Sequence, residues 1–264
     1  MSRSTSVTLF DDGHHSCIVY HSLVRGKGVQ ANQFLIRDGN SGILLDPGGD
    51  LLFAPLIIQL SKVDALDTLD YIFASHQDPD IIASMGRWMM KTPAKVICPK
   101  LWERFLPHLV SGYLDGQTGI DLERRIIGVK DLGMRLPFGK SELLILPAHF
   151  LHSVGNMQIF DPVSKILFSG DIGASIGAGT AADPVVNFDK HVQYMQGFHQ
   201  RYMCANKACK LWVNMVRQLD IETIVPQHGQ AFVGKKIVKR FLDWIEKLEC
   251  GVDLIGINNY RVPT

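Results

Sequence analysis

The sequence predicts an α/β protein built as a four-layer αββα sandwich, in which two sheets pack face to face and helices cover both outer faces. The chain of 264 residues is 46% hydrophobic and 20% charged, which is enough apolar material for a full core. Strand patterns are followed by helical patterns twice along the chain, as such a layered fold requires. No linker-like, low-complexity or repeated segment divides the sequence, so we expect a single domain over residues 1–264.

The first half of the chain is rich in short strand patterns separated by Gly, Asn and Pro turns. Alternating or continuous apolar runs mark the strands, and a 3.6-residue period marks one helix. The predicted elements are strands over residues 16–21, 33–37, 42–45 and 71–75, a helix over 82–90 and a strand over 95–98. The passage from 71 to 98 is therefore a β–loop–α–β unit.

The second half repeats the change from strands to helices. A Gly-rich and Ala-rich loop separates the two groups of elements, from residue 171 to about residue 180. The predicted elements are strands over 125–129, 134–138, 142–146, 157–160 and 166–168, a bent helical region over 190–219, a strand over 223–225 and a helix over 235–248.

Charge and cysteine usage limit the classes of partner. Lys and Arg total 27 against 26 for Asp and Glu, and the bases are scattered, so we expect no nucleic-acid partner. No apolar run reaches the roughly 20 residues of a membrane-spanning helix, and the N-terminus lacks a secretory apolar segment, so we expect a cytoplasmic protein without a membrane partner. The five cysteines form no C-x-x-C pair and are read as reduced thiols.

A cluster of metal-ligand residue types follows the predicted strand 71–75. His76, Asp78 and Asp80 alternate along the chain, and Pro79 favours an extended backbone at Asp78, so that the three side chains share one face. This spacing suits a metal site. Taken alone, the motif can also be explained without a metal, because Asp80 is a suitable N-cap for the helix that follows.

Three further loops each place a ligand-type residue next to a predicted strand. His152 precedes the strand 157–160, Asp171 follows the strand 166–168, and His228 follows the strand 223–225. Each is individually explained by a hydrogen-bonded loop histidine or a turn aspartate. Together with the 76–80 motif, they favour one metal centre formed by loops at strand ends.

These motifs resemble the metallo-β-lactamase superfamily, whose pattern is H-x-[HE]-x-D-H followed by a histidine, an aspartate after a strand and a C-terminal histidine. The acidic Asp78 and the spacing from His152 to Asp171 and His228 are similar to the flavodiiron branch. The segments 32–36 and 44–48 resemble the opening strands of that family. The resemblance covers nearly the whole chain and implies the metallo-β-lactamase fold.

The resemblance also implies a ligand set for two iron ions. The first ion is expected on His76, Asp78 and His152, and the second on Asp80 and His228. Asp171 is expected to bridge them together with an oxo, hydroxo or peroxo species. Three carboxylates and one such bridge nearly neutralise two ferrous ions, and mixed imidazole and carboxylate donors suit iron or manganese.

Two details of the motifs bear on the exact site. Ile81 stands where the family usually has a histidine, so the second metal keeps an open position where dioxygen can bind. His149 and His152 share one loop; we assign His152 as the ligand and His149 to the outer shell, with the reverse assignment left open. Tyr202 lies where flavodiiron relatives carry aromatic residues near the metals, and an ordinary core tyrosine is the alternative.

Flavodiiron enzymes carry an FMN domain after this core, whereas only residues 229–264 follow His228, so no FMN is expected in this chain. We therefore expect a diiron protein that binds dioxygen or NO as a sensor in signalling such as chemotaxis, with a signalling protein as partner; the resemblance also implies a homodimer. Whether it is an enzyme stays open. The alternatives are an O2/NO reductase supplied by an external flavoprotein or rubredoxin, and a zinc-dependent hydrolase, which Asp78 and Ile81 disfavour.

Overall fold

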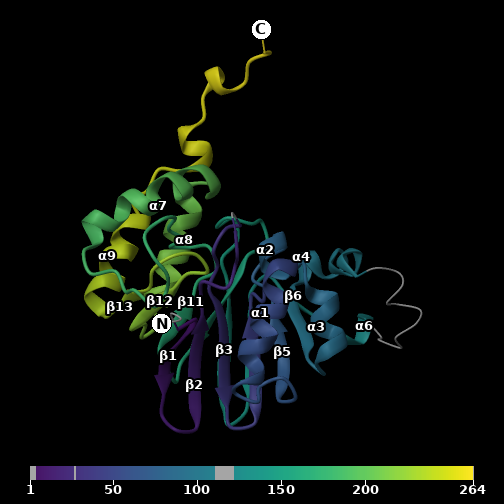
Figure 1. The fold of residues 1–264 in the computed structure, drawn as a ribbon. Coiled ribbons are helices and arrows are strands. Elements are labelled where there is room, and N and C mark those ends of the chain that lie inside the picture. Colours follow the sequence, from purple (N-terminus) through teal and green to yellow (C-terminus); the bar gives the residue numbers. More distant parts are fainter. Residues whose placement is uncertain (1–3, 27, 111–121, 264) are drawn as a thin grey trace.

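The computed structural model describes residues 4–26, 28–110 and 122–263, and Figure 1 shows two sheets packed face to face between outer layers of helices. One sheet has seven strands in the order β1-β2-β3-β4-β5-β6-β7, and the other has six in the order β13-β12-β11-β10-β9-β8. The predicted αββα fold class is confirmed.

The first sheet changes from antiparallel to parallel pairing at β4. Strands β1 to β4 pair antiparallel, with short turns in the β1–β2 and β3–β4 hairpins, whereas β4 to β7 pair parallel, with crossover segments between them. Its strands are β1 (Ser6–Asp11), β2 (His15–Tyr20), β3 (Gln33–Asp38), β4 (Ser41–Leu45), β5 (Leu69–Phe73), β6 (Lys95–Pro99) and β7 (Ile126–Val129). Strand β1 was not predicted from the sequence; it is a half-exposed strand at the edge of the sheet.

The second sheet is antiparallel except where β11 pairs parallel with β12. Its strands are β8 (Met134–Phe138), β9 (Ser141–Pro147), β10 (Met157–Asp161), β11 (Ile166–Phe168), β12 (Thr223–Val225) and β13 (Phe232–Val233). Because β5, β11 and β12 all end at the same edge of the sandwich, the loops that follow them meet there (Figure 1).

The alternation of side chains along β3 shows how the layers form. Phe34 and Ile36 point between the sheets and pack with Phe168 of the second sheet, whereas Leu35 points outward into the cluster under the first helical layer. The side chains of Phe34, Leu35 and Ile36 are at most 1% exposed. Strands buried on both faces read as continuous apolar runs, which is the pattern observed here.

Helices form the two outer layers. The helices and short 3-10 turns are α1 (Asp50–Ser61), α2 (Pro79–Ile82), α3 (Met85–Lys91), α4 (Lys100–Glu103), η1 (Leu106–Leu109), α6 (Leu122–Arg125), α7 (Phe188–Tyr202), α8 (Asn206–Val216), α9 (Lys235–Ile245), η2 (Gly251–Leu254) and η3 (Ile257–Asn259). Helices α1 and α3 pack against the first sheet, and α7, α8 and α9 pack against the second.

Two predicted helices are each interrupted. The helix expected over 82–90 is divided near Ser84, whose hydroxyl donates to the carbonyl of Gly48 at 2.6 Å and accepts from the indole of Trp88 at 3.1 Å. The region expected over 190–219 is divided at Met203, which is fully buried with an extended backbone. Tertiary contacts at these points replace helical hydrogen bonds.

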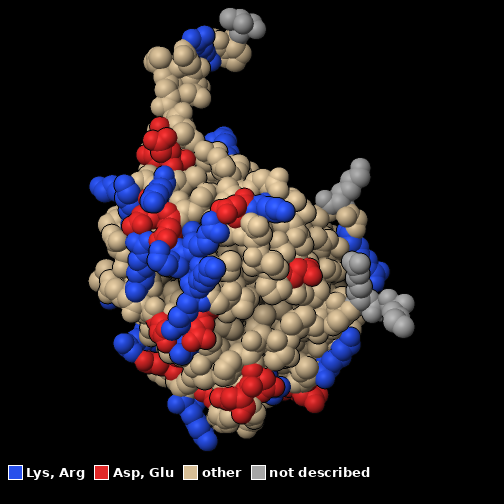
Figure 2. All heavy atoms as spheres, turned by 90° about the vertical axis from the view of Figure 1, so that its left-hand side faces the viewer, with Lys and Arg blue, Asp and Glu red and all other residues tan. Residues whose placement is uncertain are grey.

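The outer helices of the second sheet carry a mixed-charge surface (Figure 2). Helix α9 contributes Lys235, Lys239 and Arg240, which pair with Asp220, Asp243 and Asp189 respectively. Such exposed pairs contribute at most about 1 kcal/mol each. In the part of the chain that the structure describes, no helix has the length and apolar character needed to cross a membrane.

Candidate metal centre

The loop after β5 holds the first donors in place. Asp78 caps α2 with an extended backbone (φ −64°, ψ 149°), as expected for the residue before Pro79. His76 is 1% exposed, and its Nδ1 shares a hydrogen bond of 2.9 Å with the hydroxyl of Ser75. That contact turns the other ring nitrogen, Nε2, toward the centre.

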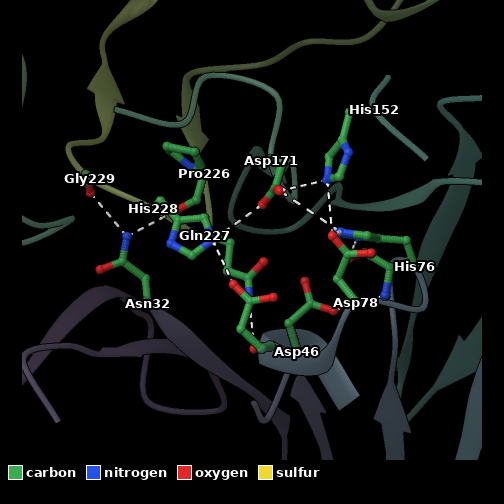
Figure 3. Close-up of polar contacts among 12 residues, drawn as sticks. Asn32, Asp46, His76, Asp78, His152, Asp171, Pro226, Gln227, His228 and Gly229 are labelled. Carbon is green, nitrogen blue, oxygen red and sulfur yellow. Dashed lines mark hydrogen bonds and ion pairs between the residues drawn. The ribbon is translucent and has the colours of Figure 1, made fainter. Parts of the chain in front are cut away.

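Two imidazoles and two carboxylates meet in one half of the centre (Figure 3). Nε2 of His152 lies 3.0 Å from Oδ2 of Asp171 and 3.5 Å from Oδ2 of Asp78. Nε2 of His76 lies 3.8 Å and 3.6 Å from the same two oxygens. Donor atoms of His76, Asp78 and His152 all lie within 4.8 Å of one another, which is the spacing of a metal-binding group.

The second half is formed by His228 and Asp80. Nε2 of His228 lies 3.4 Å from Oδ2 of Asp80 and 3.5 Å from Oδ1 of Asp171. Nδ1 of His228 donates to the carbonyl oxygen of Gln30 at 2.7 Å. A histidine that donates one ring N–H to a carbonyl presents its other nitrogen as a ligand, so the orientation of His228 is that of a metal ligand.

Among the buried polar atoms that lack a hydrogen-bond partner, three belong to this centre: Nε2 of His76, Nε2 of His152 and Oδ1 of Asp171. Buried polar atoms are normally satisfied, and each exception needs an explanation. Because these three atoms lie together, cations bound at the centre would satisfy all of them. Three imidazoles and three carboxylates, without a thiolate, are donors that iron accepts. The residues present therefore fit a pair of iron ions.

The electrostatics keep the shared carboxylate ionised. Burial acts to raise the pKa of Asp171, but the contact with His152 and the charges of His228 and His76 lower it to about 2. Burial acts to lower the pKa of His228, but Asp80 and Asp171 raise it to about 9. The carboxylates of the centre thus hold negative charge that only cationic partners balance.

Two residues that the sequence analysis did not single out support the loops. Asp46 accepts a hydrogen bond from the backbone N–H of Ser75 at 2.8 Å, and burial raises the pKa of Asp46 to about 6. Asn32 donates to the carbonyl oxygens of Pro226 and Gly229 at 2.9 and 3.0 Å, on either side of His228. Their signal in the sequence is a polar residue directly flanking a buried strand.

The remaining predicted residues have distinct surroundings. The ring of Tyr202 lies edge-on to that of His152, with centroids 5.7 Å apart, and stacks on Phe198 at 4.8 Å. Ile81 is fully buried in the core under the first helical layer. Nε2 of His149 lies 2.8 Å from the carbonyl oxygen of Asp131, and among the described residues we find no contact between His149 and the six donors.

Comparison with known proteins extends these findings. A family model described as "ODP family beta lactamase" matches residues 29–229. The structure titled "Peroxy diiron species of chemotaxis sensor ODP" is 37% identical, covers 97% of this chain and 99% of its own, and has a TM-score of 0.83. The apo state of the chemotaxis sensor ODP from T. denticola is 38% identical over 96% and 98% of the two chains, with a TM-score of 0.81.

More distant matches share the fold. A flavo di-iron protein variant from Thermotoga maritima is 19% identical over 91% of this chain and 60% of its own, with a TM-score of 0.72. An uncharacterised protein of Methanocaldococcus jannaschii is 28% identical over 85% of this chain and 55% of its own. The chain thus spans about half the length of that curated relative.

Proposed function

Because the chain belongs to the ODP family of β-lactamase-fold proteins, we propose that it is a non-haem diiron protein that binds dioxygen and acts as an oxygen sensor. The observation that carries this proposal is the position of Asp171. Its two carboxylate oxygens face two separate groups of donors, Oδ2 toward His152 and Oδ1 toward His228. A carboxylate in this position suits a pair of ions.

In this proposal His76, Asp78 and His152 hold the first iron ion, and Asp80 and His228 hold the second. Asp171 is shared between the two. Two ferrous ions supply the electrons that dioxygen takes up on binding. The donor set supports iron, since its three carboxylates are hard oxygen ligands and no cysteine of the described chain lies among the six donors.

The residues around the donors leave a position for a small ligand beside apolar side chains. Phe198 and Tyr202 both lie edge-on to His152, with centroids 5.9 and 5.7 Å away, and cover it with apolar surface. Ile81 adds no donor next to Asp80, because an isoleucine side chain has no ligand atom, and it is buried in the core under the first helical layer. The second ion therefore has fewer protein ligands than the first, which leaves room for dioxygen or NO.

A sensor role is favoured over turnover by the likeness to a chemotaxis sensor along nearly the whole of both chains. Binding of dioxygen transmits a signal only if it favours one protein conformation over another. We propose that this conformation is recognised by a signalling protein in the cytoplasm, and that the protein functions as a homodimer with one domain in each subunit. These assignments rest on the family likeness.

The proposal is tested by loading the protein with Fe2+ under anaerobic conditions, adding dioxygen and following the near-ultraviolet and visible spectrum. We expect two iron ions per chain and a persistent ligand-to-metal charge-transfer band. Continuous consumption of dioxygen with excess reductant would instead indicate a reductase. Protein that holds two zinc ions and hydrolyses esters or phosphodiesters without iron would indicate a hydrolase.

A matched pair of variants separates the centre from general effects on the fold. Asp171→Asn removes the shared carboxylate, and we expect the charge-transfer band to disappear. Asp131→Asn changes an exposed aspartate that our proposal places outside the centre, and the band should be unchanged. An unaltered spectrum in Asp171→Asn would contradict the proposed centre.

A further inference from the structure

A second group of metal-ligand residues lies at the other end of β10 from the diiron centre. Met157, the first residue of β10, donates its backbone N–H to the carbonyl of Ser75, next to His76. Asp161 is the last residue of the same strand. It faces His15 and Cys17 at the start of β2, so the group joins the two sheets.

The three side chains converge because of strand geometry. His15 and Cys17 are two residues apart on β2 and therefore share one face of the sheet. Oδ2 of Asp161 lies 2.8 Å from Nε2 of His15 and 3.3 Å from Sγ of Cys17. None of the three residues is more than 2% exposed. The group is thus closed to solvent, as structural metal sites are.

The second ring nitrogen of His15 supplies an independent observation. Nδ1 of His15 is buried without a hydrogen-bond partner, and it lies 3.9 Å from Oδ2 of Asp38. The other oxygen of Asp38 lies 2.7 Å from Nε2 of His14. Histidines that bind a metal through one nitrogen commonly direct the other toward a carboxylate. The unpartnered Nδ1 of His15 has this relationship to Asp38.

We propose that His15, Cys17 and Asp161 form a structural site for one divalent cation of the zinc class, separate from the diiron centre. The ligands are Nε2 of His15, the thiolate of Cys17 and the carboxylate of Asp161, a combination that Zn2+ favours. The hydroxyl of Ser164 donates to Asp161 beside the site. The bound cation would tie β2 of one sheet to β10 of the other.

The group has the same net charge when it holds protons and when it holds a divalent cation. With protons alone, an imidazolium, a carboxylate and a neutral thiol sum to zero net charge. A divalent cation replaces the proton on Nε2 of His15 and the thiol proton of Cys17, and the sum with one thiolate and one carboxylate is again zero. No net charge is then buried in either state, and both protons leave to solvent.

The thiolate distinguishes this site from the diiron centre, whose proposed ligands include no sulfur. We would titrate iron-loaded protein with Co2+ and record the near-ultraviolet thiolate-to-cobalt charge-transfer band. One Co2+ per chain should produce the band, and added Zn2+ should abolish it. Cys17→Ser should lose the band, whereas Cys98→Ser, which removes another fully buried thiol of the same sheet, should retain it.

The absence of a thiolate band in the wild-type protein at excess Co2+ would overturn the proposal, as would a band that persists in Cys17→Ser. If Cys17→Ser does not fold, His15→Gln provides the second test: Zn2+ should raise the melting temperature of the wild type but not that of this variant. An equal rise in both would also overturn the site. Iron content should remain at its wild-type value in each variant, so failure here is distinguishable from failure of the diiron proposal.

Discussion

Oδ1 of Asp171 lies 3.5 Å from Nε2 of His228, a contact that joins the loop after β11 to the loop after β12. These two strands are parallel neighbours, so their ends lie side by side. The other oxygen of the same carboxylate lies 3.0 Å from Nε2 of His152, in the loop before β10. One side chain thus connects donors from three loops, and its removal affects both halves of the centre.

We expect Asp171→Asn to weaken iron binding by roughly 150-fold to 5,000-fold, because removing one member of a buried set of charges costs roughly 3–5 kcal/mol. The variant leaves His152 and His228 in place without the carboxylate between them. Iron content after equilibration with a competing chelator measures the effect. Two tightly held iron ions in the variant would contradict the shared role of Asp171.

Asp80→Ala tests whether the two halves are separable. Oδ2 of Asp80 faces His228, whereas Asp78 faces His76 and His152. We expect Asp80→Ala to release one iron ion and to keep about one per chain on the His76 group. Iron analysis after desalting measures this outcome. The complete loss of both ions would show that the halves bind cooperatively and are not separable.

The sequence indicated the six proposed ligands because most of them lie in loops next to strands, while Asp80 lies in the first turn of α2. Their division into two groups came from the family resemblance and stays a prediction; in the structure Oδ2 of Asp80 lies 3.4 Å from Nε2 of His228. Asn32 and Asp46 were missed. Asn32 hydrogen-bonds with Gly229, which is far along the chain, and no local pattern reveals such a partner.

Some features of the fold also could not be predicted from local sequence patterns. Most strand positions followed from alternation and turn residues, although the half-exposed strand β1 and the two-residue strand β13 did not. Helix α1 (Asp50–Ser61) was not predicted, because Pro55 lies inside a continuous apolar run that has no clear helical period. The break in the helix at Ser84 depends on a hydrogen bond with Gly48, in a different loop. For this break, a contact between distant segments was decisive.

The choice between His149 and His152 is open to a direct test. We expect His152→Ala to lose the first iron ion, since its Nε2 is buried between Asp78 and Asp171. His149→Ala should retain both ions, because the His149 ring hydrogen-bonds to Asp131 instead. Iron content and the charge-transfer band measure both variants. Loss of iron in His149→Ala alone would reverse the assignment.

Tyr202→Ala tests the aromatic cover of the centre. Tyr202 stacks on Phe198 and forms a T-shaped pair with His152, and such pairs contribute about 1 kcal/mol. We expect two iron ions to remain bound while the dioxygen-dependent band decays several-fold faster, because water reaches His152 more easily. Stopped-flow absorption measures the decay. Tyr202→Phe keeps the ring and should decay at the wild-type rate; an effect as large as that of Tyr202→Ala would point to the hydroxyl.

The pH dependence of stability should depend on His199. This residue is fully buried, and its Nε2 accepts a hydrogen bond from the backbone N–H of Gly173 at 2.9 Å while its Nδ1 donates to the carbonyl of Met195 at 2.7 Å. Burial lowers the pKa of His199 to about 4. A proton on Nε2 would point at the N–H of Gly173, and the two N–H groups would repel each other. The folded protein therefore accommodates the neutral ring of His199.

Between pH 6.5 and pH 4 the unfolded chain binds a proton at this histidine and the folded protein does not, so the free energy of unfolding falls as the pH falls. The loss attributable to His199 should be on the order of 3 kcal/mol across that range. Denaturant titrations at several pH values measure it. The decline should be smaller in His199→Gln, while His108→Gln, which alters an exposed histidine, should follow the wild type. Metal ligands titrate equally in all three proteins, so parallel curves for wild type and His199→Gln would refute this assignment.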